Sequence, residues 1–514
     1  MSMPLPWLSL IIWLPSLAAL LIAVTPRSWV RLIQTLALAA GGASALFSLR
    51  LFLVQFFTNL PALGKFQEVE ALPWLDSLGI QYKVGVDGLS LSMMLLTGLV
   101  SMAALWMSLS IDKRQKEYFV LCLLAITGVY GVFASIDLFF FVIFYELASI
   151  PMYFLVGIWG SDKIGSGRPI YKERAATKLL IYLQLGGGIV LLGILALYFA
   201  TGAKTFDLQI LLQSHLSAAH QKVLFILFFA GFAIEAGLVP LHTWLPEGHS
   251  SAPTPLSMLL AGVLLKMGGY GILRFCLQLT PAASAAFLPA FAILGAVNVL
   301  YGGLCALRQS DVKVMIAYSS VCHMGMFFLG IGCCAGPAPF NTYGLLGAHF
   351  QLFSHGVITA LLFAVAGAVY GKTHSRDLRA WGGLAARTPI FAFFYILAAM
   401  GSLGLPGMTG FWAEFMVLFG SWGSLTWGTY HIPLLTVMAV PGLLLTTMFM
   451  LRSVQYGFFG PLNPDHCNVP DASWWEVVAF VTLASPALFF GIVPRLLTEP
   501  TLRIIPALLG VETP

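Results

Sequence analysis

Two ionisable residues, Glu235 and Lys266, lie inside neighbouring apolar stretches of the sequence. The first stretch breaks near Pro240, and a compact polar turn with Glu247 and His249 leads into the second stretch. Charged side chains and interrupted helices are costly at membrane depth, so they are expected where they line a cavity or a path for ions. This part of the sequence therefore predicts an ion pathway.

A second interrupted stretch lies at 398–420. Pro406 breaks it between two glycines, and Glu414 follows two helical turns later. Pro240 and Pro406 thus mark broken helices in the two halves of the sequence, each near a carboxylate. Paired interruptions of this kind point to inverted repeats in transporters. The alternative is two unrelated proline kinks, which are common in membrane helices.

Further titratable residues lie in or beside the other apolar runs. Glu146 is near the middle of the fifth run, and Lys178 opens the sixth, where it either reaches back to the interface or is buried. His323 lies in the tenth run, and His349 and His355 are six residues apart in the eleventh, hence on different helix faces. Taken singly, each histidine is best explained as a hydrogen-bonded structural residue. As a group with the buried carboxylates and lysines, they favour a functional pathway.

Carboxylate, imidazole and amine groups can each take up and release a proton, and burial moves their pKa values toward neutrality. A sodium site would need several oxygen ligands together, and an organic substrate would need a larger pocket with aromatic walls. The sequence shows neither. There is no nucleotide-binding loop and no nucleophile motif, and the seven cysteines show no CxxC spacing. We therefore expect proton transfer, with no metal, no cofactor and no catalytic or redox residue in this protein.

The composition predicts a polytopic membrane protein of a single integral domain, residues 1–514. The sequence is 59% hydrophobic and only 9% charged, whereas about a quarter of the residues are charged in a soluble domain. We expect an all-α fold with fourteen spans, a surface loop at 58–87 and no nucleic-acid partner. The predicted spans are 6–25, 29–57, 88–109, 117–134, 137–158, 175–201, 222–241, 256–276, 285–308, 312–333, 341–371, 388–420, 432–459 and 475–494.

The basic residues predict the orientation of these spans. When the Lys and Arg residues outside the spans are assigned to alternating loops, the face opposite the termini receives about twice as many as the terminal face. Cytoplasmic loops carry the excess of Lys and Arg. Both termini are therefore expected on the non-cytoplasmic side.

Ordered motifs over nearly the whole sequence resemble the antiporter-like, proton-translocating M-type subunit (subunit 4) family of respiratory complex I, whose counterpart is the D-type subunit of the photosynthetic NDH-1 complex. The motifs are VGVDGLSL (84–91), YELASIPMYFLVGIWG (145–160), AATKLLIY (175–182), VPLHTWLPEGHSSAPT (239–254), LLAGVLLKMGGYGILRF (259–275), DVKVMIAYSSVCHMG (311–325), QLFSHG (351–356), THSRDLRAWGGL (373–384), GSLGLPGMTGFWAEF (401–415) and YGFFG (456–460).

The resemblance implies two inverted five-helix repeats, spans 4–8 (117–276) and 9–13 (285–459), with broken helices in spans 7 and 12. Residues 1–110 would form the first three spans, and 475–514 the last span and a tail. A proton path would run through Glu146, Lys266, His355 and Glu414. Lys178 and His323 also match family positions, and His349 matches no position of known function. The implied partners are other membrane subunits of an NAD(P)H- or ferredoxin-quinone oxidoreductase in a bacterial inner membrane or thylakoid, where quinone reduction elsewhere supplies the energy.

One position departs from the family pattern. Glu235 occupies a site that is usually lysine, the partner of the span-five glutamate, and Gly237 replaces a usual proline. We hypothesise that Glu146 and Glu235 share a proton, or that Lys178 turns toward them as a replacement cation. The alternatives are a weakened pump, a variant subunit of a carbon dioxide uptake complex, a subunit of a multi-chain Na⁺/H⁺ antiporter, or a subunit that only tethers its neighbours.

Overall fold

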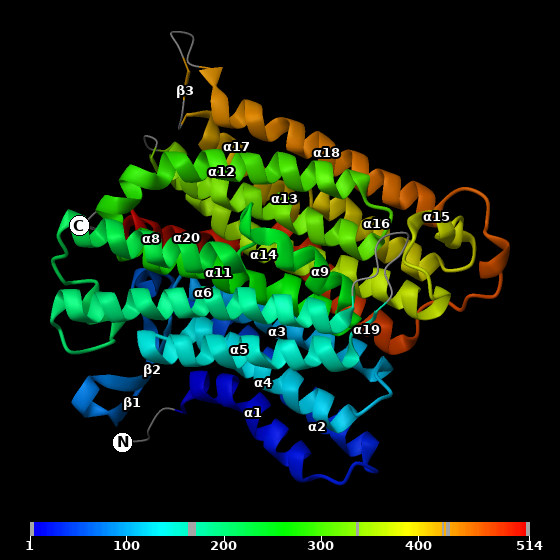
Figure 1. Ribbon diagram of the computed structural model, residues 1–514, viewed down its shortest axis with the longest axis horizontal. Coiled ribbons are helices and arrows are strands. Elements are labelled where there is room, and N and C mark those ends of the chain that lie inside the picture. Colours follow the sequence, from blue (N-terminus) through cyan, green and yellow to red (C-terminus); the bar gives the residue numbers. More distant parts are fainter. Residues whose placement is uncertain (1–4, 163–170, 336–338, 424–425, 428–431, 510–514) are drawn as a thin grey trace.

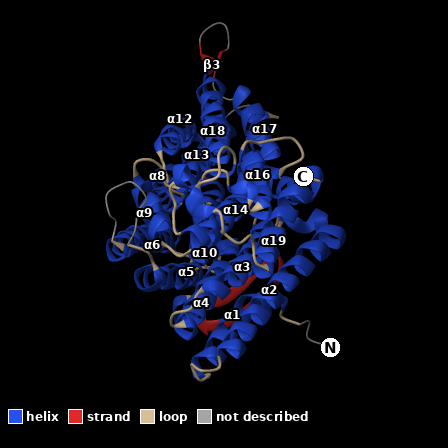
Figure 2. Cartoon of the chain, turned by 90° about the vertical axis from the view of Figure 1, so that its right-hand side faces the viewer, coloured by secondary structure: helices blue, strands red, loops and turns tan. Residues whose placement is uncertain are grey.

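The computed structural model describes the chain except for residues 1–4, 163–170, 336–338, 424–425, 428–431 and 510–514. Long helices run side by side, and both described chain ends lie on the same face of the bundle, at the left in Figure 1. Figure 2 views the opposite face, along the helices. This arrangement agrees with an even number of spans.

Thirteen helices among the described residues are long and apolar enough to cross a membrane. They are α1 (Trp7–Val24), α2 (Val30–Asn59), α3 (Ser90–Met107), α4 (Gln115–Ala134), α5 (Leu138–Trp159), α6 (Lys172–Thr201), α8 (Ala218–Glu235), the continuous run α10 to η6 (Thr254–Gln278), α12 (Pro281–Arg308), α13 (Val312–Gly332), α14 (Phe340–Thr373), α18 (Leu434–Phe458) and α19 (Trp474–Ile492). The remaining predicted span is divided between α16 (Pro389–Ser402) and α17 (Thr409–Trp422). The prediction of a polytopic helical protein is confirmed.

Two spans form the centre of the bundle. The apolar parts of Thr254–Gln278 and of α14 are entirely buried within the protein, whereas less than half of the apolar parts of α2, α6 and α18 is buried. The exposed helices present large apolar side chains such as Phe57, Phe199 and Leu444, as expected of surfaces that face lipid or other apolar neighbours. The central helices carry Lys266 and His355, so the candidate site lies in the core.

Both expected interruptions are present. In the first, α8 ends at Glu235 and the chain passes through η4 (Leu241–Thr243) and α9 (Trp244–Ser251) before α10 begins. In the second, α16 ends at Ser402 and α17 begins at Thr409. Gly237, Gly404 and Gly407 take positive φ angles at the breaks, a backbone conformation that glycine adopts without steric cost.

Two matching loop contacts lie on opposite faces of the bundle. On the terminal face, Asp137 and Asp207 form an isolated antiparallel bridge, and they cap α5 and the short helix α7 (Leu208–Leu211). On the other face, Asp311 and Asp377 bridge in the same way, and they cap α13 and α15 (Leu378–Trp381). In Figure 1, β2 and α15 lie at opposite ends of the bundle, at the left and the right. The same contact at equivalent places on opposite faces is the arrangement expected of two inverted repeats.

The loop at 58–87 is not a simple surface loop. It forms η1 (Leu60–Gly64), a short helical turn η2 (Asp76–Leu78) and an antiparallel hairpin of β1 (Gln67–Leu75) and β2 (Ile80–Val86). The carboxylate of Glu70 accepts hydrogen bonds from the backbone N–H groups of Leu8 (2.8 Å) and Ser9 (3.0 Å), which satisfies donors at the start of α1. The all-α expectation is thus wrong for this segment, and for the short pair β3 (Thr426–Trp427) and β4 (Ile432–Pro433).

The C-terminal tail forms a further helix, α20 (Arg495–Leu508), which packs against η1 and α14. Short helical turns complete the described elements: η3 (Ser108–Ser110), η7 (Cys333–Ala335), η8 (Leu384–Ala386) and η9 (Pro464–His466).

Candidate functional site

Lys266 lies at the centre of a span with unusual helical geometry. The span consists of α10 (Thr254–Leu259), the π-helical η5 (Leu260–Leu264), α11 (Leu265–Gly271) and the π-helical η6 (Ile272–Gln278). π-Helical turns within α-helices are frequent at functional sites. The Lys266 side chain is fully buried, and its Nζ lies 2.5 Å from the carbonyl oxygen of Ala261 and 2.5 Å from Nδ1 of His355.

His323 connects His355 to Glu414. The two imidazole rings are 5.6 Å apart between centroids. Nδ1 of His323 lies 3.5 Å from Oε1 of Glu414, and Nε2 lies 2.9 Å from the hydroxyl of Ser402. Four titratable residues from α11, α14, α13 and α17 therefore form one connected row.

A small cavity of about 10 Å³ adjoins this row, lined by His323, Gln351, Ser354, His355, Ser402 and Glu414 among other residues. This is space for about one water molecule. Nε2 of His355 and the hydroxyl of Ser354 are buried without a hydrogen-bond partner among the described residues. A water molecule in the cavity would satisfy such groups and continue the row between the imidazoles and the carboxylate.

The second helix break places Glu414. A Cβ atom on Gly404 would overlap Oε2 of Glu414, so the carboxylate packs directly against the glycine backbone of the turn. The break thus has a specific role, because it makes room for the carboxylate beside His323.

The first helix break depends on Asn298 of α12. Its Oδ1 accepts from the backbone N–H of Val239 (2.7 Å), and its Nδ2 donates to the carbonyls of Val321 (3.0 Å) and Gly237 (3.4 Å). A broken helix inside a membrane is tolerated where its freed backbone groups find partners of this kind. Asn298 was not among the residues predicted from the sequence, since nothing local marks it.

Glu235 ends α8 and is completely buried. Neither carboxyl oxygen has a geometrically sound hydrogen-bond partner among the described residues. The hydroxyl of Tyr145 lies beside the carboxyl group, and Glu146 is close enough to interact with it electrostatically. Glu146 itself is half-buried on α5 and accepts a hydrogen bond from Nε2 of Gln184.

Lys178 does not join these carboxylates. Its Nζ lies 2.8 Å from Oε1 of Glu247, in the polar turn that follows the first break. The hypothesis that Lys178 turns toward Glu146 and Glu235 as a replacement cation is therefore wrong for this structure. Lys178 instead pairs with the carboxylate of Glu247. Nε of the exposed Arg174 also lies 4.0 Å from Oε2 of this carboxylate.

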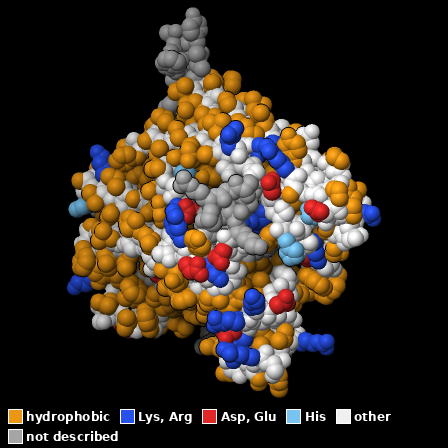
Figure 3. Space-filling model, turned by 45° about the vertical axis from the view of Figure 1, so that its right-hand side comes forward, with side chains coloured by type: hydrophobic (Ala, Val, Ile, Leu, Met, Phe, Trp, Pro, Cys, Tyr) orange, Lys and Arg blue, Asp and Glu red, His pale blue; other side chains and the backbone are white. Residues whose placement is uncertain are grey.

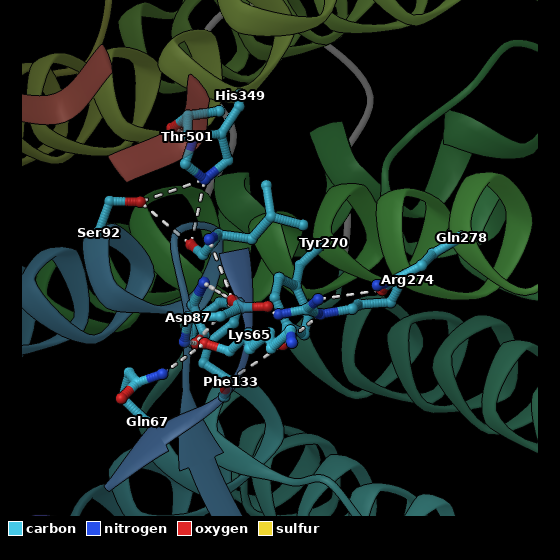
Figure 4. Close-up of polar contacts among 12 residues, drawn as sticks. Lys65, Gln67, Asp87, Ser92, Phe133, Tyr270, Arg274, Gln278, His349 and Thr501 are labelled. Atoms are coloured by element: carbon cyan, nitrogen blue, oxygen red, sulfur yellow. Dashed lines mark hydrogen bonds and ion pairs between the residues drawn. The ribbon is translucent and has the colours of Figure 1, made fainter. Parts of the chain in front are cut away.

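His349 belongs to a separate polar cluster near the terminal face, which Figure 4 shows. Its Nε2 lies 3.1 Å from the hydroxyl of Ser92, and its Nδ1 lies 2.8 Å from the hydroxyl of Thr501. Below it, Arg274 forms a buried ion pair with Asp87. Nε of Arg274 also donates to the Tyr270 hydroxyl at 3.0 Å.

Three basic residues that the alternating pattern assigns to loops are almost fully buried. Arg274 is 1% exposed, Lys313 is 3% exposed and Arg376 is 4% exposed. Their partners are distant in sequence, as Asp87 is for Arg274, so the sequence alone could not place them.

Six of the eight candidate residues thus form two groups, and Lys178 and His349 lie outside both. Lys266, His355, His323 and Glu414 are in one connected row, while Glu146 and Glu235 lie together at the first break. No hydrogen bond or ion pair within the described part of the chain joins the two groups directly. Groups that can each hold or release a proton, enclosed among apolar helices, are suited to moving protons.

Comparisons with known proteins agree with a role in proton movement. Residues 135–440 match the family model described as "NADH:quinone oxidoreductase/Mrp antiporter, TM". The chain is 38% identical over 495 residues to NAD(P)H-quinone oxidoreductase chain 4 1 of Synechococcus elongatus, covering 96% of this chain and 90% of that one. It is 37% identical to NAD(P)H-quinone oxidoreductase chain 4 of Acaryochloris marina, again covering 96% and 90%.

Solved structures show the same fold. A chain of respiratory complex I from Thermus thermophilus matches with a TM-score of 0.84 at 26% identity, over 98% of this chain and 100% of that chain. A chain of the Mrp complex from Dietzia sp. matches with a TM-score of 0.83 at 22% identity, over 99% and 98%, which is a likeness of fold alone. The chain belongs to the NADH:quinone oxidoreductase/Mrp antiporter family, and within it to the proton-translocating, antiporter-like membrane subunits of complex I and NDH-1.

Proposed function

We propose that Lys266, His355, His323 and Glu414 form the central proton relay of this subunit. The observation that supports the proposal is the connected row itself: contacts of 2.5 Å from Lys266 to His355 and 3.5 Å from His323 to Glu414, with the centroids of the two imidazole rings 5.6 Å apart. The energy would come from quinone reduction elsewhere in the complex, so this chain carries no redox step.

The relay works by alternating charge. A charged Lys266 and a charged His355 at this distance repel each other, so adding a proton to one favours its loss from the other. A proton that leaves Lys266 for His355 would pass to His323 through a water molecule bound in the small cavity, and then to Glu414. Ser402 holds the His323 ring in place at 2.9 Å. Each transfer changes the proton affinity of the next group, which is the electrostatic coupling that the mechanism requires.

We propose that Glu235 and Glu146 share one proton at the first break, with the Tyr145 hydroxyl beside them. Both oxygens of Glu235 lack a partner among the described residues and the side chain is completely buried. An ionised carboxylate without a partner is very costly in such a place, and a protonated one is not. A protonated, neutral Glu235 would then take the place of the usual family lysine. Each of the two residues can release a proton to its neighbour.

The Glu235 proposal is tested with two variants of the assembled complex in vesicles. Glu235→Gln keeps the neutral shape and removes the exchangeable proton, and Glu235→Lys restores the usual family residue. We expect Glu235→Gln to reduce the protons moved per electron pair and Glu235→Lys to retain pumping. Identical pumping by the native chain and both variants would remove any special role for this site.

We further propose the setting of the subunit. The repeats would span 117–276 and 285–459, with residues 1–110 before them and 475–514 after them. The termini would face the non-cytoplasmic side of a thylakoid or plasma membrane, and the partners would be antiporter-like neighbours in the same complex. The cyanobacterial relatives and the shared face of the two chain ends support this setting.

The relay is tested directly by replacing its central amine. Lys266→Gln in the purified complex, reconstituted in vesicles, is expected to lower proton uptake per quinone reduced, while Lys116→Gln in the first turn of α4 leaves it unchanged. The assay is run with and without Na⁺. Uptake that requires Na⁺ would favour the Na⁺/H⁺ antiporter alternative, and unchanged uptake in Lys266→Gln would contradict the relay.

A further inference from the structure

A cavity of about 330 Å³ opens at the face opposite the termini, away from the proton relay. It lies where α3 and α14 end and where α13 and α19 begin, beside the junction of α9 and α10. Charged side chains gather on this face in Figure 3, whereas apolar ones cover the flanks. The cavity is therefore at the level of the membrane–water interface.

Three cations line the cavity against a single carboxylate. They are Lys313, Lys372 and Arg376, and the carboxylate is Glu476. Glu476 lies 3.6 Å from Lys372, so this carboxylate offsets part of the positive charge around the cavity. Arg376 pairs through Nε with Asp311 at 3.2 Å, and Lys313 donates to the carbonyl of Ala252 at 2.8 Å. With Asp311 included, the charge around the cavity is still positive.

Several donors in the cavity wall have no acceptor. Arg376 is 4% exposed, and its Nη2 has no hydrogen-bond partner among the described residues. The same holds for Nε1 of Trp475 and the hydroxyl of Ser251, which also line the cavity. A buried donor without a partner lowers the stability of the fold. The unpaired Nη2 of the Arg376 guanidinium group is suited to donate to an oxygen of a phosphate or sulfonate group.

The mouth of the cavity has an apolar side as well. Met107, Ile111 and Trp159 line it from the ends of α3 and α5. Tryptophan is enriched where membrane meets water, with the ring at the depth of the lipid headgroups. A ligand with an anionic head and an apolar body would satisfy both parts of this wall, and basic pockets between helices on the cytoplasmic side are known to suit such headgroups.

We propose that this cavity binds a tetrahedral oxyanion, supplied as the phosphate or sulfonate headgroup of an anionic membrane lipid. The oxygens accept from Arg376, Trp475 and Ser251, and Lys313 and Lys372 supply the compensating charge. Lys313 also donates to the carbonyl of Ala252 at the junction of α9 and α10, so binding of the anion beside Lys313 is expected to stabilise this junction. This proposal is independent of the proton relay.

The proposal is tested on the purified, delipidated complex by thermal unfolding during three titrations: phosphatidylglycerol, phosphatidylcholine and inorganic phosphate. Phosphatidylglycerol is expected to raise the unfolding temperature saturably, and phosphatidylcholine is not. Equal stabilisation by inorganic phosphate would assign the site to a free oxyanion. An absence of stabilisation by either anion would overturn the proposal.

Variants locate the effect in the cavity. Lys372→Gln removes a charge, and Trp475→Phe removes the N–H donor while keeping an aromatic side chain. Each should raise the half-saturating concentration of phosphatidylglycerol about fivefold, which is about 1 kcal/mol. Arg387→Gln, an exposed basic residue on the same face, is the matched control. If both cavity variants titrate like Arg387→Gln, the lipid binds elsewhere and the assignment is wrong.

Discussion

The Nζ atom of Lys266 lies 2.5 Å from Nδ1 of His355. A charged lysine has only donors, so in that state Nδ1 must carry the lone pair and the ring must be neutral. If the ring gains a proton at Nδ1, the amine must be neutral and accept. The pair therefore holds one proton between two positions, which is the property that a relay needs.

The link between the two halves of the relay is His323. We expect His323→Gln to uncouple quinone reduction from proton movement, because glutamine can hydrogen-bond to Ser402 but cannot carry a proton from His355 to Glu414. Protons moved per electron pair are measured in vesicles by the quench of a pH-sensitive dye. His349→Gln is the control, since that histidine is equally buried but bonds to Ser92 and Thr501 instead. Equal losses in the two variants would argue for a structural effect.

The turn at the second helix break should be sensitive to a single methyl group. Gly404→Ala places a Cβ against the carboxylate of Glu414 and is expected to displace it, reducing both stability and pumping. Gly407 has a similar positive φ but open space around its Cα. Gly407→Ala should therefore show only the backbone strain, about 1–3 kcal/mol, and keep most of the pumping per assembled complex. A larger loss of stability and pumping in Gly407→Ala than in Gly404→Ala would contradict the contact between Gly404 and Glu414.

Asn298 should matter for stability rather than for proton transfer. Asn298→Ala leaves the backbone N–H of Val239 at the break without its acceptor, at a cost of about 1–3 kcal/mol for a buried group. We expect a lower unfolding temperature and less assembled complex. Asn59→Ala, which loses only a side-chain contact with Gln55, is the comparison and should change little.

The buried pair of Asp87 and Arg274 should be strongly interdependent. Arg274→Gln leaves a buried carboxylate without its cation, which typically costs about 3–5 kcal/mol. The double variant Asp87→Asn with Arg274→Gln should recover much of this loss in thermal unfolding. The exposed pair of Arg27 and Glu117 is the control, and Arg27→Gln should cost about 1 kcal/mol or less. Additive effects at Asp87 and Arg274 would show that the two charges do not support each other.

The sequence was sufficient to locate the buried charges because a carboxylate or amine inside a long apolar run has few structural explanations. Glu235, Lys266 and Glu414 were recognised in this way, and both helix breaks followed from Pro240 and Pro406. The contact between His323 and Glu414 was not predictable, because it depends on how α13, α14 and α17 pack. The partners of Lys178, His349 and Arg274 also could not be predicted, because they too depend on how distant helices pack.

Two elements were missed for local reasons. In β2, buried Ile80, Tyr82 and Val84 alternate with the more exposed Gln81 and Lys83, but the strand is short and its partner β1 is mostly exposed. The helix α20 contains Pro500 and Pro506, and proline is ordinarily a helix breaker. The packing of α20 against η1 and α14 outweighs that preference.

The most direct test of the account is the number of protons moved per electron pair by the assembled complex carrying Glu414→Gln. The amide keeps the size of the side chain and its place beside Gly404 but cannot release a proton. The account predicts that this variant reduces quinone but moves clearly fewer protons per electron pair. Glu173 is an exposed carboxylate at the start of α6, and the control variant Glu173→Gln should behave like the native complex. A native proton-to-electron ratio in Glu414→Gln would contradict the relay.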